Sequence, residues 1–225
     1  MIDRAIAIQT RGLCRAFGSR IILRQIDLAI SAGQTVALTG ANGAGKTTLL
    51  RCMAALSHPS AGEVFWFGRR AAANTPACRM IGVVMHESLI YQHLTVQENL
   101  LFSARMYDVP EPVKQIERWM INVGIERHHR NLASSLSRGM RQRLALARAL
   151  VHDPRILLWD EPFSGIDKES SQWLMDLLEK LRGEGKTICF STHDLDFARN
   201  HADRTLQLHA GRLREQEFKA IAHAA

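Results

Sequence analysis

Hydrophobic and polar positions alternate in short stretches over the first part of the chain, as they do in half-buried β-strands. Residues 5–13, 21–23 and 26–30 show this pattern and predict a small antiparallel β layer. The short β-branched stretch 34–39 predicts one more strand. Beyond residue 48 the spacing becomes roughly helical, at Leu49, Leu50, Met53, Ala54 and Leu56.

The middle of the chain begins with strands and then becomes helical. Residues 62–68 predict a strand and turn, and residues 80–85 predict a buried strand. A helix is expected over residues 95–107, where Thr95 and Glu98 can form a capping box. A second helix is expected after Pro110 and Pro112, with the side chains of Val113, Ile116, Met120 and Ile121 turned inward. Residues 87–150 are therefore predicted to be a mostly helical subdomain.

The second half returns to alternating strands and helices. Residues 155–160 and 187–191 are apolar and predict strands buried on both faces, as in parallel sheets. Residues 167–181 predict a helix between them, with a core face formed by Trp173, Leu174, Leu177, Leu178 and Leu181. A final hairpin is expected from residues 205–208 and 212–214 around Gly211. The pattern indicates one α/β domain over residues 1–225, with a mainly parallel sheet.

Length and composition agree with a globular protein. The chain has 225 residues, 46% of them hydrophobic, which is sufficient for one large core. No apolar run approaches the ~18 residues of a membrane span, and residues 1–4 lack the features of a signal peptide, so we expect a cytosolic location. Four scattered cysteines, without paired spacing, argue against zinc or a disulfide framework.

The formal net charge of +7 is compatible with nucleic acid, an anionic membrane surface or nucleotide phosphates as a partner. Nine Lys or Arg residues against three acidic residues fall between positions 114 and 155. A solvated helical face would explain this excess equally well, so charge alone does not decide the partner.

The clearest chemical signal lies between the strand 34–39 and the helix that follows it. It fits the pattern of a phosphate-binding loop, in which glycines turn backbone N–H groups onto an anion at a helix N-terminus. Lys46 would reach the β and γ phosphates, and the Thr47 hydroxyl would bind Mg²⁺. The loop consists of Gly40, Ala41, Asn42, Gly43, Ala44, Gly45, Lys46, Thr47 and Thr48.

Three further sites accompany this loop. Ser137 can cap a helix that runs to residue 151, and Gly139 permits the close approach of a phosphate. Asp160 and Glu161 end one strand, and His193 follows another. Because the carboxyl ends of parallel strands meet at one edge of a sheet, we expect Asp160, Glu161 and His193 to converge on Lys46.

Each of these residues also has an ordinary explanation when taken alone. Ser137 could be a plain helix cap, Asp160 and Glu161 a solvated turn, and His193 the start of a capped helix. Phe17, between the first two strands, could stack on an adenine ring or pack in the core. A kinase or GTPase remains an alternative for the phosphate loop, but no Asn-Lys-x-Asp guanine motif is found.

Taken in order, the motifs resemble those of the ATP-binding cassette (ABC) ATPase family over nearly the whole chain. The resemblance implies a P-loop NTPase fold of ABC type, with ATP and Mg²⁺ as cofactors. It implies that Asp160 holds Mg²⁺, that Glu161 polarises the attacking water and that His193 contacts the γ-phosphate. Phe17 falls at the adenine-stacking position, and Asp167 belongs to the D-loop, residues 164–167.

Three positions depart from the family pattern. The signature, Leu-Ser-Gly-Gly-Gln in the family, has Arg138 and Met140 at its third and fifth places. His86 stands where the family has a glutamine that touches Mg²⁺ and water. His86 is therefore a candidate metal-site residue, with a surface histidine as the alternative.

The resemblance also implies partners. The signature helix would reach the nucleotide of a second ATPase subunit in a head-to-tail dimer, and integral membrane subunits would hold the cassette on the cytoplasmic side of the inner membrane. Leu89, Ile90, Tyr91 and Leu94 are expected to dock a membrane partner or to pack internally. No direct contact with nucleic acid is expected, although a soluble cassette acting on nucleic acid is an alternative.

Within the family, four sequence segments resemble those of the haem-exporter ATPase of cytochrome c maturation. They are residues 86–87, 94–100, 137–143 and 160–167. Other small exporter cassettes share some of these segments. The resemblance implies haem as cargo and leaves another small cargo open.

Overall fold

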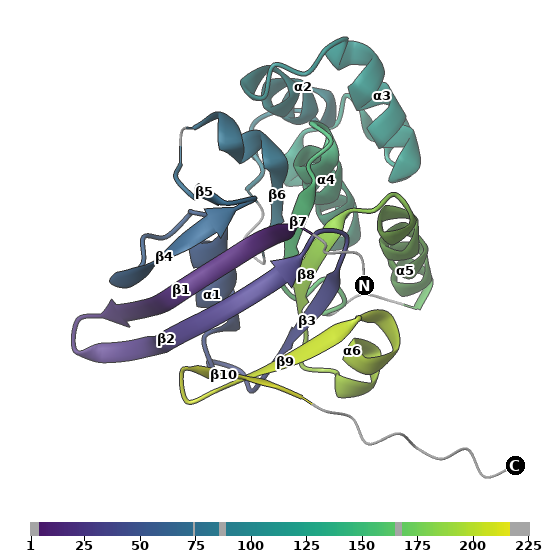
Figure 1. Ribbon diagram of the computed structural model, residues 1–225. Coiled ribbons are helices and arrows are strands. Elements are labelled where there is room, and N and C mark those ends of the chain that lie inside the picture. The colour runs from purple at the N-terminus through teal and green to yellow at the C-terminus, as the bar shows by residue number, and fades with distance from the viewer. Residues whose placement is uncertain (1–4, 74, 86–88, 165–167, 217–225) are drawn as a thin grey trace, which may run out of the picture.

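The computed structural model describes residues 5–73, 75–85, 89–164 and 168–216, whose strands form two sheets (Figure 1). The smaller sheet is antiparallel, with strand order β2-β1-β4-β5. Its strands are β1 (Ile6–Phe17), β2 (Arg20–Ser31), β4 (Ala61–Trp66) and β5 (Arg69–Arg70). The expected antiparallel β layer is confirmed.

The larger sheet has strand order β10-β9-β3-β8-β7-β6 and is parallel except at β10. Its strands are β3 (Thr35–Thr39), β6 (Ile81–Val84), β7 (Ile156–Trp159), β8 (Thr187–Ser191), β9 (Arg204–His209) and β10 (Arg212–Glu215). The predicted α/β class, with a mainly parallel sheet, is therefore confirmed.

One expectation for the β layer is wrong. The stretches 21–23 and 26–30 are parts of the single strand β2, not two strands. Gln25 has φ 48°, and its N–H points at the Cys14 Sγ, 3.2 Å away. This irregularity shifts the alternation by one residue, so that Leu23 and Ile26 are both buried.

The parallel sheet separates two hydrophobic cores. In β7, Leu157 and Trp159 pack into the core beneath the helices, whereas Ile156 and Leu158 pack toward the β layer. Because successive side chains of a strand point to opposite faces, an unbroken apolar run serves both cores. Helix α1 (Lys46–Met53) lies in the second core, between the two sheets (Figure 1). Leu56, expected on this helix, lies beyond its end and is exposed.

Three helices form the group drawn at the top of Figure 1. They are α2 (Val96–Met106), α3 (Pro112–Asn122) and α4 (Arg138–Leu150), with short 3-10 turns at Pro76–Met80, Glu126–His128 and Ala133–Ser135. The capping box of α2 is present, since the Thr95 N–H donates to Glu98 Oε2 and the Glu98 N–H donates to Thr95 Oγ1. The Glu98 pKa is lowered because its carboxylate accepts from the Thr95 N–H and from the Thr95 hydroxyl.

The buried face of α3 differs from the expected one. Ile116 and Met120 are buried as expected, but Val113 and Ile121 are exposed. Trp119 and Val123 complete the face, because positions i, i+3, i+4 and i+7 share one side of a helix. Ile121 lies to one side of that stripe, and Val113 lies in the first turn.

Helices α5 (Lys168–Gly183) and α6 (Leu195–His201) pack on the helical side of the sheet. The four expected leucines of α5 are buried, and Trp173 is partly buried beneath the Arg143 guanidinium, 4.1 Å from the ring centre. All four cysteines are free thiols. Among the described helices, none has the length and apolar character needed to cross a membrane.

A half-buried histidine joins the ends of α2 and α4. The His152 ring stacks on Tyr107, with centroids 3.8 Å apart, and its Nε2 lies 3.1 Å from the Ile81 carbonyl oxygen. A carbonyl only accepts, so we assign the proton to Nε2. Nδ1 is buried and has no partner among the described residues. Burial lowers the His152 pKa to about 4, the nearby Arg148 charge acts in the same direction, and the bond to Ile81 opposes it.

We predict a pH-dependent loss of stability from this residue. The unfolded chain binds a proton near pH 6.5 and the folded chain only near pH 4, so stability falls as pH drops between these values. The loss should be on the order of 2–3 kcal/mol at pH 4. Chemical denaturation at pH 7.5 and pH 4 should show a smaller decrease for His152→Gln than for the parent. His209→Gln, at an exposed position, is the control, and equal decreases in all three proteins would contradict the prediction.

Candidate active site

The loop between β3 and α1 depends on glycine at two positions. Gly40 has φ 144° and Gly45 has φ 107°, values that side chains disfavour. A Cβ at Gly40 would lie 2.5 Å from the Leu208 carbonyl oxygen, and one at Gly45 would lie 2.8 Å from Ile22 Cγ2. The loop can therefore curl tightly against β9 and β2 only with glycine there.

Lys46 begins α1 and is turned back into this loop. Its Nζ donates to the carbonyl oxygens of Gly40 at 2.9 Å and Ala41 at 3.4 Å, and only 5% of the side chain is exposed. The same ammonium lies 3.5 Å from Glu161 Oε1. The sequence expectation that Lys46 and Glu161 converge is confirmed.

Asp160 is the centre of a buried hydrogen-bond network at the end of β7. Its Oδ2 accepts from the Thr47 hydroxyl at 2.8 Å, and its Oδ1 accepts from the Ser191 hydroxyl at 2.6 Å. Asp160 is 4% exposed and Ser191 is fully buried. Because β7 and β8 are adjacent and parallel, their carboxyl ends bring these two side chains together. Ser191 was not among the residues expected from the sequence, since a serine ending a strand carries no distinctive signal.

Glu161 follows in an unusual backbone conformation, with φ 47°. Its N–H donates to Ser191 Oγ at 2.8 Å, and its carbonyl accepts from the Ser164 N–H at 3.2 Å. A residue with a side chain adopts this region only where surrounding contacts hold it. These bonds direct the Glu161 carboxylate toward Lys46 and leave it 24% exposed.

A cleft of about 640 Å³ opens over the loop. It is lined by Phe17, Arg20, Ile22, Asn42, Gly43, Gly45, Lys46, Thr47, Thr48, Arg51, Asp160 and Glu161. Arg20 and Arg51 were missed from the sequence because neither belongs to a motif. Gly40, Ala41 and Ala44 shape the loop without lining the cleft.

Phe17 lies at the end of β1 with 54% of its surface exposed, so the core-packing alternative is wrong. The Arg15 guanidinium lies 4.4 Å from the centre of the ring. The ring lines the cleft beside the phosphate loop, where an aromatic face can stack on a base.

His193 and the signature helix lie outside this cleft. His193 is exposed and lines a separate pocket of about 190 Å³, which Glu161 also lines. Ser137 caps α4 by accepting from the Met140 N–H at 3.2 Å, and Gly139 has open space around it. The structure therefore brings His193 near Glu161, whereas Ser137 and Gly139 do not line the cleft over the loop of their own chain. His86 and Asp167 lie outside the described residues.

The donors in the cleft fit a nucleotide with Mg²⁺. A lysine ammonium and the α1 N-terminus suit phosphate oxygens, and the Thr47 hydroxyl and Asp160 carboxylate are hard oxygen ligands. Mg²⁺ usually takes one or two protein ligands and completes its shell with phosphates and water. This agrees with the absence, among the described residues, of a cluster of three or more histidine, cysteine or acidic side chains that could hold a metal alone.

A comparison with known families agrees with this site. The family model described as ABC transporter matches residues 23–164. The chain belongs to the ABC transporter family. The match includes the phosphate loop, the signature helix and the Asp160–Glu161 pair.

Relatives and solved structures extend the likeness over most of the cassette. This chain is 36% identical over 216 residues to a sulfate/thiosulfate import ATP-binding protein of Synechococcus elongatus, and the alignment covers 95% of this chain and 63% of that protein. It is 36% identical over 193 residues to the ABC transporter ATP-binding protein NatA of Bacillus subtilis, covering 84% and 78%. A dimeric ATP-binding cassette in a post-hydrolysis state, bound to ADP and Pi, superposes with a TM-score of 0.85 at 28% identity, covering 94% and 99%. The fold is that of an ABC ATPase.

Proposed function

We propose that this chain binds ATP with Mg²⁺ and hydrolyses the bond to its γ-phosphate as the ATPase subunit of an ABC transporter. Residues 1–225 would act as one unit. The network of Thr47, Asp160 and Ser191 beside Lys46 is the observation that carries the proposal. When bound, Mg²⁺ would supply positive charge that neutralises the phosphate oxygens. Thr47 and Asp160 would hold it, and Lys46 would bind the β and γ phosphates.

Glu161 is proposed to activate the attacking water. A carboxylate that lines the cleft and is partly exposed can accept a proton from water beside the terminal phosphate. The bonds from its backbone to Ser191 and Ser164 hold it in place before the nucleotide binds. His193, which lines a neighbouring pocket together with Glu161, is proposed to contact the γ-phosphate, and Phe17 to stack on the adenine.

Two cassettes are proposed to act together. Ser137 and Gly139 do not line the cleft of their own chain, and open space surrounds Gly139, which supports contact with the nucleotide of a partner cassette. The similar solved cassette is itself dimeric. ATP would stabilise the closed pair by bridging both chains, and hydrolysis would remove that bridge.

An apolar surface beside the cleft is the proposed dock for a membrane subunit. Leu89 and Tyr91 are 44% and 51% exposed, and Tyr91 meets Phe102 of α2 edge-on at 5.0 Å. Ile90 is buried and Leu94 is half-buried, so only part of the stretch expected from the sequence is available. Exposed apolar groups that cluster in this way often mark an interface.

Two cargo classes follow from different observations. The four sequence segments that resemble the haem-exporter ATPase favour haem export for cytochrome c maturation. The Synechococcus relative is named for sulfate/thiosulfate import, which favours a small anion instead. The membrane proteins that co-purify with this chain would separate the two.

The activity is tested by Glu161→Gln. Loss of the carboxylate should lower ATP turnover about 100- to 10,000-fold while ATP still binds, because Lys46 and the loop are unchanged. Steady-state phosphate release and ATP titration measure the two effects. Glu184→Gln, the same change at an exposed position after α5, should retain the parental rate. Parental turnover by Glu161→Gln would show that the assigned role is wrong.

The dock is tested by the double variant Leu89→Asp, Tyr91→Asp. It should fold and bind ATP but fail to co-purify with integral membrane subunits, because two charges would be placed in an apolar interface. Val113→Asp, Ile121→Asp is the matched control, since these α3 side chains are equally apolar and exposed. Complex formation by the first variant at the level of the control would exclude this surface.

A further inference from the structure

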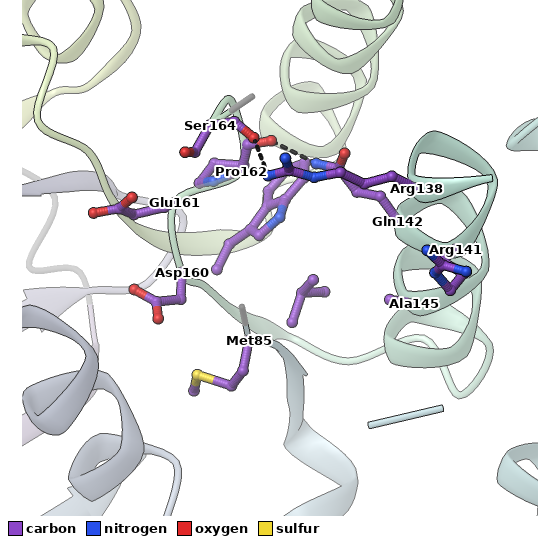
Figure 2. A pocket seen from close by; sticks show the side chains of 11 residues that line it. Met85, Arg138, Arg141, Gln142, Ala145, Asp160, Glu161, Pro162 and Ser164 are labelled. Carbon is purple, nitrogen blue, oxygen red and sulfur yellow. Dashed lines mark hydrogen bonds between the residues drawn. The ribbon is translucent and has the colours of Figure 1, made fainter. Parts of the chain in front are cut away.

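The turn that carries Glu161 is held at three backbone atoms, and Figure 2 shows the two bonds that come from α4. The Glu161 N–H donates to Ser191 Oγ. The Pro162 carbonyl accepts from Gln142 Nε2, and the Ser164 carbonyl accepts from Arg138 Nη2 at 3.1 Å. One of these ties therefore comes from β8, and two come from α4.

The two side chains from α4 act from one face of the helix. Arg138 and Gln142 are four residues apart, so they lie one turn above the other. Figure 2 shows both reaching across a small cavity to the turn, on whose far side Asp160 and Glu161 lie. Arg141 lines the same cavity but donates to Leu136, next to its own helix.

Arg138 stands at a signature position where the family pattern has glycine. A glycine has no side chain that could reach the Ser164 carbonyl, so the tie depends on this chain's own sequence. The same first turn of α4 carries Ser137 and Gly139, which are proposed to meet the partner's nucleotide. Arg138, which follows the signature residue Ser137, thus contacts the turn that carries Glu161, the proposed base.

We propose that Arg138 is a positioning residue that holds the turn from Glu161 to Ser164 and so couples the orientation of the Glu161 carboxylate to the position of the signature helix. The inference rests on the proposed function, because it concerns the base of that reaction. Arg138 does not line the nucleotide cleft and acts only through the turn.

The physical reason is that the turn is strained and charged at one end. Glu161 is held at φ 47°, and its carboxylate lies 3.5 Å from the Lys46 ammonium. Without the tie at Ser164, the backbone can relax from the left-handed region and the carboxylate can move. A base displaced by about 1 Å can lose a factor of roughly 100 in rate.

The test compares Arg138→Met with Arg141→Met in the full chain. Arg138→Met should lower single-turnover ATP hydrolysis about 10- to 100-fold and leave ATP affinity unchanged. Arg138→Lys should recover part of the rate, because an ammonium can still donate to the carbonyl. Arg141→Met removes the same charge from the same helix and cavity and should keep the parental rate.

A second comparison, made in the Glu161→Gln variant, separates a positioning role of Arg138 from other roles. Added to Glu161→Gln, Arg138→Met should cause no further loss, because both changes disable the same base. A loss that multiplies with that of Glu161→Gln would overturn the proposal and assign Arg138 to a different contact, such as the partner's nucleotide. A parental rate for Arg138→Met alone would overturn it as well.

Hydrogen exchange tests the tie without turnover. The amides of Asp160, Glu161, Phe163 and Ser164 should exchange faster in Arg138→Met than in Arg141→Met, and equal exchange would overturn the proposal. If the parent chain shows no hydrolysis that depends on Glu161, the proposed function fails, while the exchange result still decides whether Arg138 holds the turn.

Discussion

The buried carboxylate of Asp160 is the group on which the site depends. A carboxylate removed from water is unfavourable unless donors replace its hydration, and here hydroxyls from Thr47 and Ser191 do so. These donors come from the start of α1 and the end of β8, while Asp160 ends β7. One acid therefore joins three elements, with partners 113 and 31 residues away in the chain, and the position of Glu161 follows from it.

The parallel sheet makes this convergence possible. Its central strands are apolar at almost every position because they are buried on both sides, one facing the β layer and α1, the other facing the helices. Two separate cores hold β7 and β8 in register, so their last residues meet at one edge. The polar groups begin where the apolar strands end, which places the chemistry at the boundary of the core.

The sequence predicted the features that are local and chemically distinctive. The phosphate loop, the capping box at Thr95 and the positions of most strands along the chain could be predicted because each rests on residues close together in the chain. The bulge at Gln25 and the role of Trp119 in α3 could not, since one depends on backbone geometry and the other on tertiary packing. Ser191 and Arg138 show the same limit within the site, because a hydroxyl or guanidinium gains its role only from a distant partner. His86 and Asp167 stay predictions.

The proposed role of Asp160 is to organise a site for ATP with Mg²⁺. The most direct measurement is calorimetric titration of ATP, with and without Mg²⁺, into the parent chain and Asp160→Asn. Mg²⁺ should strengthen ATP binding by the parent. The variant should lose that gain, because an amide lacks the negative charge, yet keep its affinity for ATP alone through Lys46 and the loop. An equal effect of Mg²⁺ on both proteins would contradict the account.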